Sequence, residues 1–215
     1  MARYHLSKDD EYFNVSNYSR LPNLSIQKFE ERLADIIGRP TRLRPFVCEG
    51  SPLACRVFIV GLNPASPMKS GFWDFWKADV GFDKAAWMEA YTAERASRPL
   101  KPGKSRRNKI SRSRAIIEHI LSELGLTRCL ETNIYAAATE EFSELPAHLR
   151  DTNAFDFLLE AIRPDVIIVH GIPAVEHIQR KAPQVTVLNV PHLSRGWRNE
   201  EARALGRKVR LLTKG

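Results

Sequence analysis

Three residues with amide or imidazole side chains stand where apolar runs of the sequence end. Asn63 and Asn133 each follow such a run directly, and His192 comes soon after a third one. An Asn side chain offers one acceptor and two donors, which match the edge of a nucleobase. A histidine N–H held in place stabilises negative charge that grows on a leaving group. These groups suit cleavage of an N-glycosidic bond, in which the base leaves as an anion and water attacks late.

The same segments lack the groups that other reactions need. They hold no pair of carboxylates for acid–base hydrolysis and no set of metal ligands. The sequence also contains no Walker loop and no GxGxxG motif for a nucleotide cofactor. The three cysteines, too few for the usual iron–sulfur cluster, form no Cys-x-x-Cys pair; they are Cys48, Cys55 and Cys129. We therefore expect neither a metal nor an organic cofactor.

Four apolar runs closed by turn residues predict buried strands, at 57–60, 129–133, 166–169 and 185–190. Helical spacing predicts helices between and around them, at 26–37, 84–96, 116–124, 153–162 and 173–180. Parallel strands need crossover helices, so this alternation predicts an α/β fold. The expected architecture is a three-layer α/β/α arrangement with a central four-stranded parallel sheet. In such a sheet all strand exits share one edge, so Asn63, Asn133 and His192 should converge.

The remaining segments predict one domain over 1–215, with an N-terminal arm and helix at about 1–38. Residues 38–52 contain three prolines and predict a connecting loop. Near the other end, 199–205 predicts a last helix that Gly206 ends, followed by an extended segment at 209–212.

The charge pattern favours a polyanionic partner. The formal net charge is +8, and nine Lys or Arg residues without an acid lie between Arg95 and Arg114. Seven more, with two glutamates, lie between Arg195 and Lys214. A generic basic surface is the alternative, but two dense clusters favour nucleic acid. No apolar run is long enough to span a membrane and no signal peptide is present, so we expect a cytoplasmic protein without a membrane partner.

Three short motifs resemble those of the uracil-DNA glycosylase superfamily. They are GLNPAS at 61–66, TNIY at 132–135 and PHLSRG at 191–196. The first resembles the GxNP-type branches, the mismatch-specific thymine/uracil and the single-strand-selective uracil glycosylases. The resemblance covers residues 55–197 in the family's order and implies a uracil-DNA glycosylase-like fold and a monomeric DNA repair enzyme, nucleoid-associated if the protein is bacterial.

The resemblance also implies roles for individual residues. Asn63 would position the attacking water, and the backbone around Leu62 would help to orient the base. Phe75 would stack on the extruded base, with Phe72 as the second choice. Asn133 would hydrogen-bond the base edge and select uracil over cytosine.

The PHLSRG motif at 191–196 would complete the catalytic site and contact DNA. His192 would donate a hydrogen bond to the base O2 as the glycosidic bond breaks. Arg195 and its neighbours would fill the space that the extruded base leaves. The expected contacts to DNA are Ser66, Ser194, Arg195, Arg106, Arg107 and Lys109.

Several positions depart from the family pattern. Ala65 replaces a glycine, Leu193 replaces a proline, and Asn63 stands where the most active branch has an acid. These departures predict a slow enzyme or an altered base preference, with deaminated purines among the conceivable substrates. A catalytically silent nucleic-acid-binding module and an enzyme for free nucleosides or nucleotides are the alternatives. The basic clusters disfavour the enzyme for free nucleosides or nucleotides. His170 lies at a strand exit but matches no motif, and it is interpreted as structural or as a support for the residues that touch the ligand.

Overall fold

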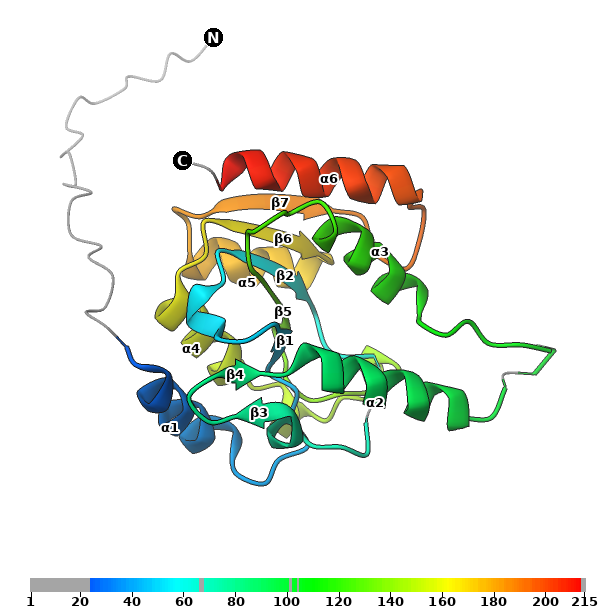
Figure 1. Ribbon diagram of the computed structural model, residues 1–215, viewed down its shortest axis with the longest axis horizontal. Coiled ribbons are helices and arrows are strands. Elements are labelled where there is room, and N and C mark those ends of the chain that lie inside the picture. The colour runs from blue at the N-terminus through cyan, green and yellow to red at the C-terminus, as the bar shows by residue number, and fades with distance from the viewer. Residues whose placement is uncertain (1–23, 66–67, 101, 104, 214–215) are drawn as a thin grey trace, which may run out of the picture.

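A five-stranded sheet forms the centre of the protein (Figure 1). The computed structural model describes residues 24–65, 68–100, 102–103 and 105–213, and the strands follow the order β1-β5-β2-β6-β7. The strands are β1 (Phe46–Cys48), β2 (Val57–Gly61), β5 (Cys129–Asn133), β6 (Val166–His170) and β7 (Thr186–Val190). β5, β2, β6 and β7 run parallel to one another. β1 pairs with β5 in the antiparallel direction.

The four strands predicted from apolar runs are confirmed, but the sheet has one more. β1 lies in the segment that was expected to be a loop, so the prediction of a four-stranded, wholly parallel sheet was wrong. β1 is three residues long, and all three are buried. So short a strand between prolines shows no alternating pattern in the sequence. The fold is mixed α/β with a mostly parallel sheet.

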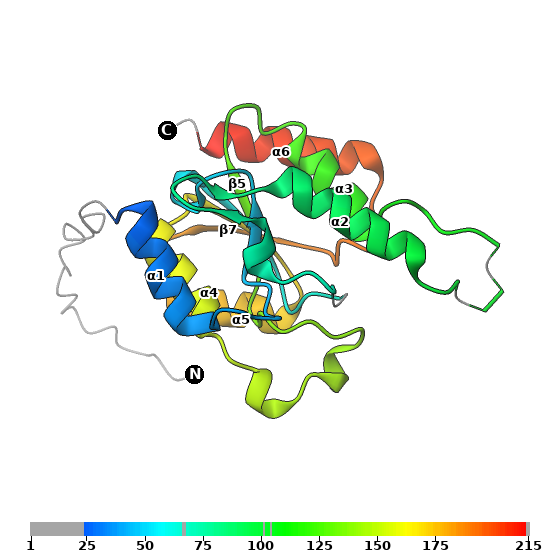
Figure 2. The same ribbon diagram turned by 60° about the horizontal axis from the view of Figure 1, so that its bottom comes forward.

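Helices cover both faces of the sheet (Figures 1 and 2). They are α1 (Ile26–Ile37), α2 (Lys84–Ser97), α3 (Arg112–Leu121), α4 (Asn153–Ile162), α5 (Ile172–Lys181) and α6 (Asn199–Leu212). Ile59 and Ile168 pack in one core cluster with α3 and α6, while Phe58 and Ile167 pack in another with α1, α4 and α5. No helix among the described residues is long and apolar enough to cross a membrane.

The first helix follows the prediction from sequence closely. The Ser25 hydroxyl accepts a hydrogen bond from the backbone N–H of Lys28 at 3.2 Å, as an N-cap does. At the other end Gly38 has a φ of 78°, a conformation that favours glycine. Phe29 and Leu33 on the buried face of α1 are fully inaccessible to solvent.

The last helix corrects the prediction for the C-terminal segment. Gly206 lies inside α6, and the helix continues to Leu212 instead of giving way to an extended segment. At Gly206, α6 crosses α3 so closely that a Cβ would lie 2.8 Å from Glu123 Cβ and closer still to the Ile120 carbonyl oxygen. Gly206 therefore permits a close helix contact, which its sequence context did not reveal.

A buried carboxylate connects the sheet to α2 and α3. Glu131 in β5 is 7% exposed, and it forms ion pairs with Lys84 (2.9 Å) and Arg114. Burial raises the pKa of Glu131, but the positive charges of Arg114 and Lys84 outweigh burial and hold this pKa below its ordinary value. The Arg114 guanidinium also lies 4.9 Å from the centre of the Trp87 ring, so the cluster fixes α2 beside α3.

The substitution Gly206→Ala tests the close crossing of α3 and α6. In an open helix this change stabilises by about 1 kcal/mol. At this crossing we expect the opposite sign, a loss of about 1–3 kcal/mol in the free energy of unfolding, because the added methyl group overpacks the contact. Denaturant titration measures the change, with the exposed Arg203→Ala in α6 as the control. A stabilised Gly206→Ala variant would contradict the crossing.

Candidate functional site

Gly61, the last residue of β2, lies beneath two polar side chains from the neighbouring strands. A Cβ on Gly61 would lie 2.6 Å from Asn133 Oδ1 and 3.0 Å from His170 Nε2. Asn133 ends β5 and His170 ends β6, on either side of β2. Because Gly61 has no side chain, the amide oxygen and the imidazole both fit over the end of β2.

A second histidine joins this group from the loop after β7. The rings of His170 and His192 meet edge to face, with centroids 4.8 Å apart and an interplanar angle of 84°. Asn133, His170 and His192 thus come together at the carboxyl edge of the sheet.

The sequence predicted that Asn63, Asn133 and His192 converge. The structure brings Asn133 and His192 together through His170. The hydrogen bonds of the Asn63 amide go instead to Thr139 and to the carbonyl oxygen of the following residue. From the sequence, His170, which lies between Asn133 and His192, had no part in the chemistry. Its position at a strand exit was the available signal.

Ser194 fixes the tautomer of His192. The backbone N–H of Ser194 donates to His192 Nδ1 at 3.3 Å, and the Ser194 hydroxyl lies 2.8 Å from the same nitrogen. A backbone N–H can only donate, so Nδ1 is the acceptor and the proton of the neutral ring is on Nε2. The Ser194 hydroxyl, predicted to contact a phosphate, bonds to the imidazole in this structure, and the phosphate contact stays a prediction.

Both histidines are held neutral near pH 7. Burial, followed by the neighbouring His192, lowers the pKa of His170 to about 4. Partial burial, followed by the charge of Arg195, lowers the pKa of His192 below its ordinary value. A neutral His192 presents Nε2–H as a donor without bringing a full positive charge into the site.

Asn63 is braced by the segment that follows β5. Its amide nitrogen donates to Thr139 Oγ1 at 2.8 Å and lies 3.5 Å from the Pro64 carbonyl oxygen. The backbone adds two bonds, from Thr139 N to Pro64 O at 3.1 Å and from Tyr135 N to Leu62 O at 2.9 Å. The Leu62 carbonyl is therefore already in use, and the amide nitrogen of Asn63 points toward Thr139.

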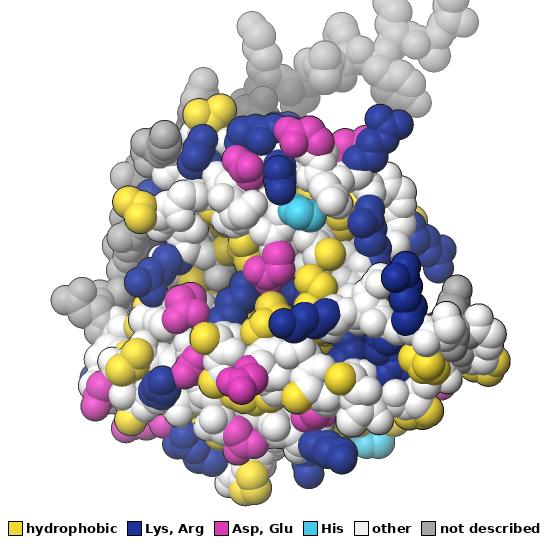
Figure 3. Space-filling view, turned by 45° about the vertical axis from the view of Figure 1, so that its right-hand side comes forward, with side chains coloured by type: hydrophobic (Ala, Val, Ile, Leu, Met, Phe, Trp, Pro, Cys, Tyr) yellow, Lys and Arg dark blue, Asp and Glu magenta, His cyan; other side chains and the backbone are white. Residues whose placement is uncertain are grey.

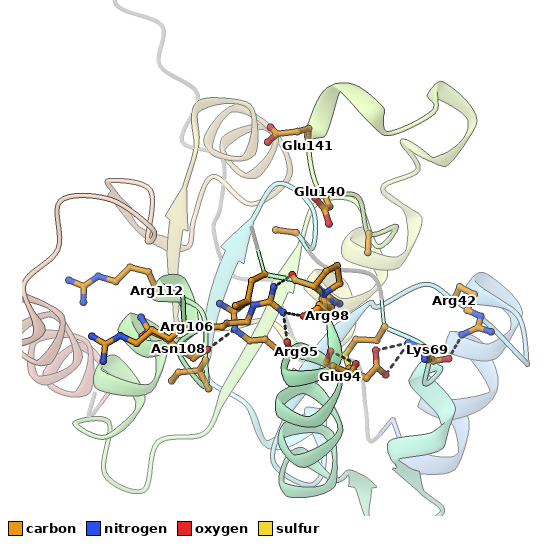
Figure 4. A pocket seen from close by; sticks show the side chains of 18 of the residues that line it. Arg42, Lys69, Glu94, Arg95, Arg98, Arg106, Asn108, Arg112, Glu140 and Glu141 are labelled. Carbon is orange, nitrogen blue, oxygen red and sulfur yellow. Dashed lines mark hydrogen bonds between the residues drawn. The ribbon is translucent and has the colours of Figure 1, made fainter. Parts of the chain in front are cut away.

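A cleft of about 1650 Å³ adjoins this loop, with Ala65 and Ala138 in its wall. Figure 3 shows basic side chains around the hollowed face, with several acidic ones among them. The basic lining residues are Arg42, Lys69, Arg95, Arg98, Arg106, Arg107 and Arg112. In Figure 4, Glu140 and Glu141 lie across the cleft from most of these cations. The cleft thus has a basic side and an acidic rim.

Arg107 holds the backbone of the cleft wall in place. Its guanidinium donates to the carbonyl oxygens of Arg95 (2.5 Å), Arg98 (3.0 Å) and Pro99. It was expected to contact DNA, but these three bonds make it a brace for the basic segment. By contrast, Arg106 and Lys109, the other two cations predicted to contact DNA from this segment, are exposed.

Arg112 connects the basic segment to the loop that carries His192. It donates to the Trp197 carbonyl, and its other terminal nitrogen lies 3.5 Å from Asn199 Oδ1. Trp197 Nε1 in turn donates to the Pro191 carbonyl at 3.3 Å, which closes the loop around His192. From the sequence, Arg112 was one cation of the cluster between Arg95 and Arg114, with no role of its own.

Phe72 and Phe75 lie in the core, where they are 3% and 7% exposed. Phe72 stacks on Phe82 with a centroid distance of 5.3 Å and an interplanar angle of 28°, and Phe75 meets the same ring at 5.9 Å. They were expected to stack on a base, but their burial leaves neither ring a face open to a ligand. The aromatic run serves as a hydrophobic cluster under the loop.

The remaining predicted positions fall in different surroundings. Ser66 lies outside the described residues. Arg195 is exposed, and its backbone N–H donates to the His192 carbonyl at 3.0 Å. Leu193 is fully buried in the core cluster of α3 and α6, which gives this departure from the family motif a structural role as an anchor for the His192 loop.

The described residues contain no group of three or more His, Cys, Asp or Glu side chains placed to hold a metal ion. Burial raises the pKa of the Cys48 and Cys129 thiols well above the ordinary value. These thiols are therefore poor nucleophiles.

No family model matches the chain, and no curated protein sequence matches it.

The lowered pKa of His170 predicts an acid-sensitive fold. Unfolding returns this pKa to about 6.5, so between pH 6.5 and about 4 the unfolded chain binds a proton that the folded chain does not. Stability from this group is present above pH 6.5 and falls as the pH drops toward 4, by on the order of 3 kcal/mol. We expect a flatter pH dependence of the unfolding free energy in His170→Gln.

Urea titrations from pH 4 to pH 7.5 measure this dependence. The exposed His148→Gln variant is the control, which should follow the wild-type curve. Identical curves for wild type and His170→Gln would show that His170 does not carry the effect.

Proposed function

We propose that this protein is a hydrolytic DNA glycosylase that removes uracil or a related deaminated base and starts base excision repair. It has a uracil-DNA glycosylase-like fold and acts as a monomer on DNA in the cytoplasm, without a metal or organic cofactor. The observation that carries the proposal is a neutral His192, with its proton fixed on Nε2 by Ser194, close to Asn133 through His170 at the carboxyl edge of the sheet.

His192 stabilises the leaving base. As the N-glycosidic bond lengthens, negative charge moves onto the base, and Nε2–H donates a hydrogen bond to its O2. Ser194 and the packing against His170 fix the imidazole before the reaction starts, so little reorganisation is needed. A donor of this kind contributes about 100- to 1000-fold to the rate.

Asn63 positions the water. The amide nitrogen of Asn63 bonds to Thr139, whereas Oδ1 has no hydrogen-bond partner among the described residues and can, as an acceptor, orient a water molecule. An amide cannot take the proton from water as a carboxylate does. This suffices for a transition state in which the base has already left, and it predicts slow turnover.

The basic cleft supports a polyanionic substrate. It adjoins the Asn63 loop, so a bound phosphate backbone passes close to the site. Phosphate contacts fix the position of the strand, and extrusion of a base costs a few kcal/mol. Glu140 and Glu141 on the far rim repel phosphates and restrict the backbone to the basic side.

A silent nucleic-acid-binding module is the second candidate. The basic cleft favours this module as well, because the cations of the cleft attract phosphates whether or not His192 is catalytic. It predicts DNA binding that weakens with salt and no release of any base.

The decisive measurement is base release from oligonucleotides that contain uracil, hypoxanthine, xanthine or mismatched thymine, in single and double strands. We expect His192→Ala and Asn63→Ala to lower kcat by about 100- to 1000-fold, because each removes a group that acts in the transition state. Asn133→Ala should mainly raise KM and weaken base selection.

Two exposed residues supply matched controls for this assay. Asn189→Ala in β7 removes an exposed amide and His148→Ala removes an exposed imidazole; neither residue belongs to the group assigned to the chemistry, and each should retain wild-type rates. No release from any substrate would refute the enzyme, and full activity in the three site variants would refute the assignment of the site.

The salt dependence of DNA affinity distinguishes cations that contact phosphates from cations that hold the protein backbone in place. Arg106→Ala and Lys109→Ala should each lower the slope of log K against log salt by about 1, since each removes one phosphate contact. Arg107→Ala should instead make the segment at 98–112 more sensitive to limited proteolysis, because it removes three bonds to carbonyl groups. An unchanged slope in both Arg106→Ala and Lys109→Ala would show that DNA does not bind to these two cations.

A further inference from the structure

A carboxylate lies among the cations on the basic side of the cleft. Glu94, in the second half of α2, accepts hydrogen bonds from the backbone N–H of Lys69 at 2.9 and 3.0 Å and from that of Ser70 at 3.3 Å. Figure 4 shows the carboxylate reaching from α2 to Lys69. Two successive backbone amides therefore converge on one anionic group, an arrangement that makes an anion-binding concavity.

The surroundings of this contact are positively charged. Arg42 donates to the Lys69 carbonyl, so a guanidinium is fixed close to the two amides. Arg42, Lys69 and Arg98 line the same cleft as Glu94, whereas the acidic rim lies across from them (Figure 4). Glu94 thus places a negative charge on the side of the cleft that attracts phosphates.

A phosphate oxygen and a carboxylate oxygen need the same partners. Each is an anionic acceptor that backbone N–H groups and nearby guanidinium groups stabilise. Glu94 is only partly buried, so its side chain can leave the amides without disturbing the core. Once the carboxylate has left, Lys69 and Ser70 present two N–H donors at the basic wall.

We propose that the backbone amides of Lys69 and Ser70 form a phosphate subsite of the cleft, which the Glu94 carboxylate occupies in the free protein. A phosphate of the bound strand replaces this carboxylate, so Glu94 competes with the substrate for the subsite. The competition weakens binding of all sequences alike, because phosphate contacts carry no sequence information. The inference rests on the proposed function for the identity of the strand, and it adds where one phosphate of that strand lies.

A contact that only braces the segment at 68–70 is the alternative interpretation. In that case the loss of Glu94 would loosen the wall of the cleft and weaken the binding of DNA. If Glu94 competes with phosphate, its loss strengthens the binding of DNA. The two interpretations therefore predict changes in affinity of opposite sign.

The test measures affinity for an oligonucleotide without any deaminated base by fluorescence anisotropy. We expect Glu94→Ala and Glu94→Gln to bind at least about 5-fold more tightly than wild type, since each removes a negative charge next to a phosphate. Glu94→Gln keeps the size of the side chain and one acceptor oxygen, so it removes the charge with the least disturbance of the segment at 68–70. Affinity equal to or below that of wild type in both variants would overturn the proposal.

Glu89→Gln is the matched control. It removes an exposed carboxylate from the same helix, and Glu89 is not among the residues that line the cleft. Because solvent and salt screen this charge, we expect the affinity to change by less than about 2-fold. A gain in Glu89→Gln as large as that in Glu94→Gln would show that only net charge matters and would overturn the subsite.

A measurement on the free protein locates the subsite. Titration with inorganic phosphate, against chloride at equal ionic strength, should shift the amide resonances of Lys69 and Ser70 in nuclear magnetic resonance spectra. The shifts should occur at a lower phosphate concentration in Glu94→Gln than in wild type, because the competing charge is gone. Shifts confined to other amides, or no shifts in either protein, would overturn the subsite even if the affinity for DNA rises.

The outcomes distinguish the subsite from the activity on which the inference rests. Base release by wild type, without a gain of affinity in the Glu94 variants, would overturn the subsite and leave the glycosylase. Tighter binding of DNA and shifted amide resonances, without base release by wild type, would support the subsite and refute the glycosylase.

Discussion

The missing side chain at Gly61 is the constraint on which the candidate site depends. β2 lies between β5 and β6 in parallel register, so its last residue is flanked by Asn133 and His170. Any Cβ at this position would lie within about 3 Å of both Asn133 Oδ1 and His170 Nε2. The ring of His170 meets the ring of His192 edge to face, which extends the group to the loop after β7.

Polar side chains that could contact a ligand are largely used to hold the walls in place. Arg107 donates three hydrogen bonds to carbonyl oxygens, and Thr139 accepts one from the Asn63 amide. A bonded guanidinium keeps its charge, so such arginines still make the cleft attractive to anions. Their fixed geometry means that a bound strand does not have to order them, which lowers the entropic cost of binding.

Local sequence patterns predicted the elements, and tertiary contacts decided the exceptions. The apolar runs indicated four strands because parallel strands are buried on both faces. Ser25 and Gly38 marked both ends of α1 because capping is local. β1 was missed because three residues hold no period. Gly206 looked like a helix end, since a close crossing with another helix leaves no mark in its own segment.

The site was predictable in the same uneven way. The strand exits predicted that Asn63, Asn133 and His192 converge, because topology brings such exits to one edge. The structure brings the last two together through His170, while the Asn63 amide bonds to Thr139. Phe72 and Phe75 were misjudged because the hydrophobic partners that bury them come from distant segments, among them Phe46 and Phe82. His170 had the right position but no motif, and its significance appears only when the neighbouring strand ends in glycine.

The cleft and the histidine loop share one support, which links binding to chemistry. Arg112 begins α3 at the end of the basic segment, lines the cleft and holds the Trp197 carbonyl. Trp197 closes the loop onto Pro191, directly before His192. The loop that carries His192 is thus held by a residue that also lines the basic cleft.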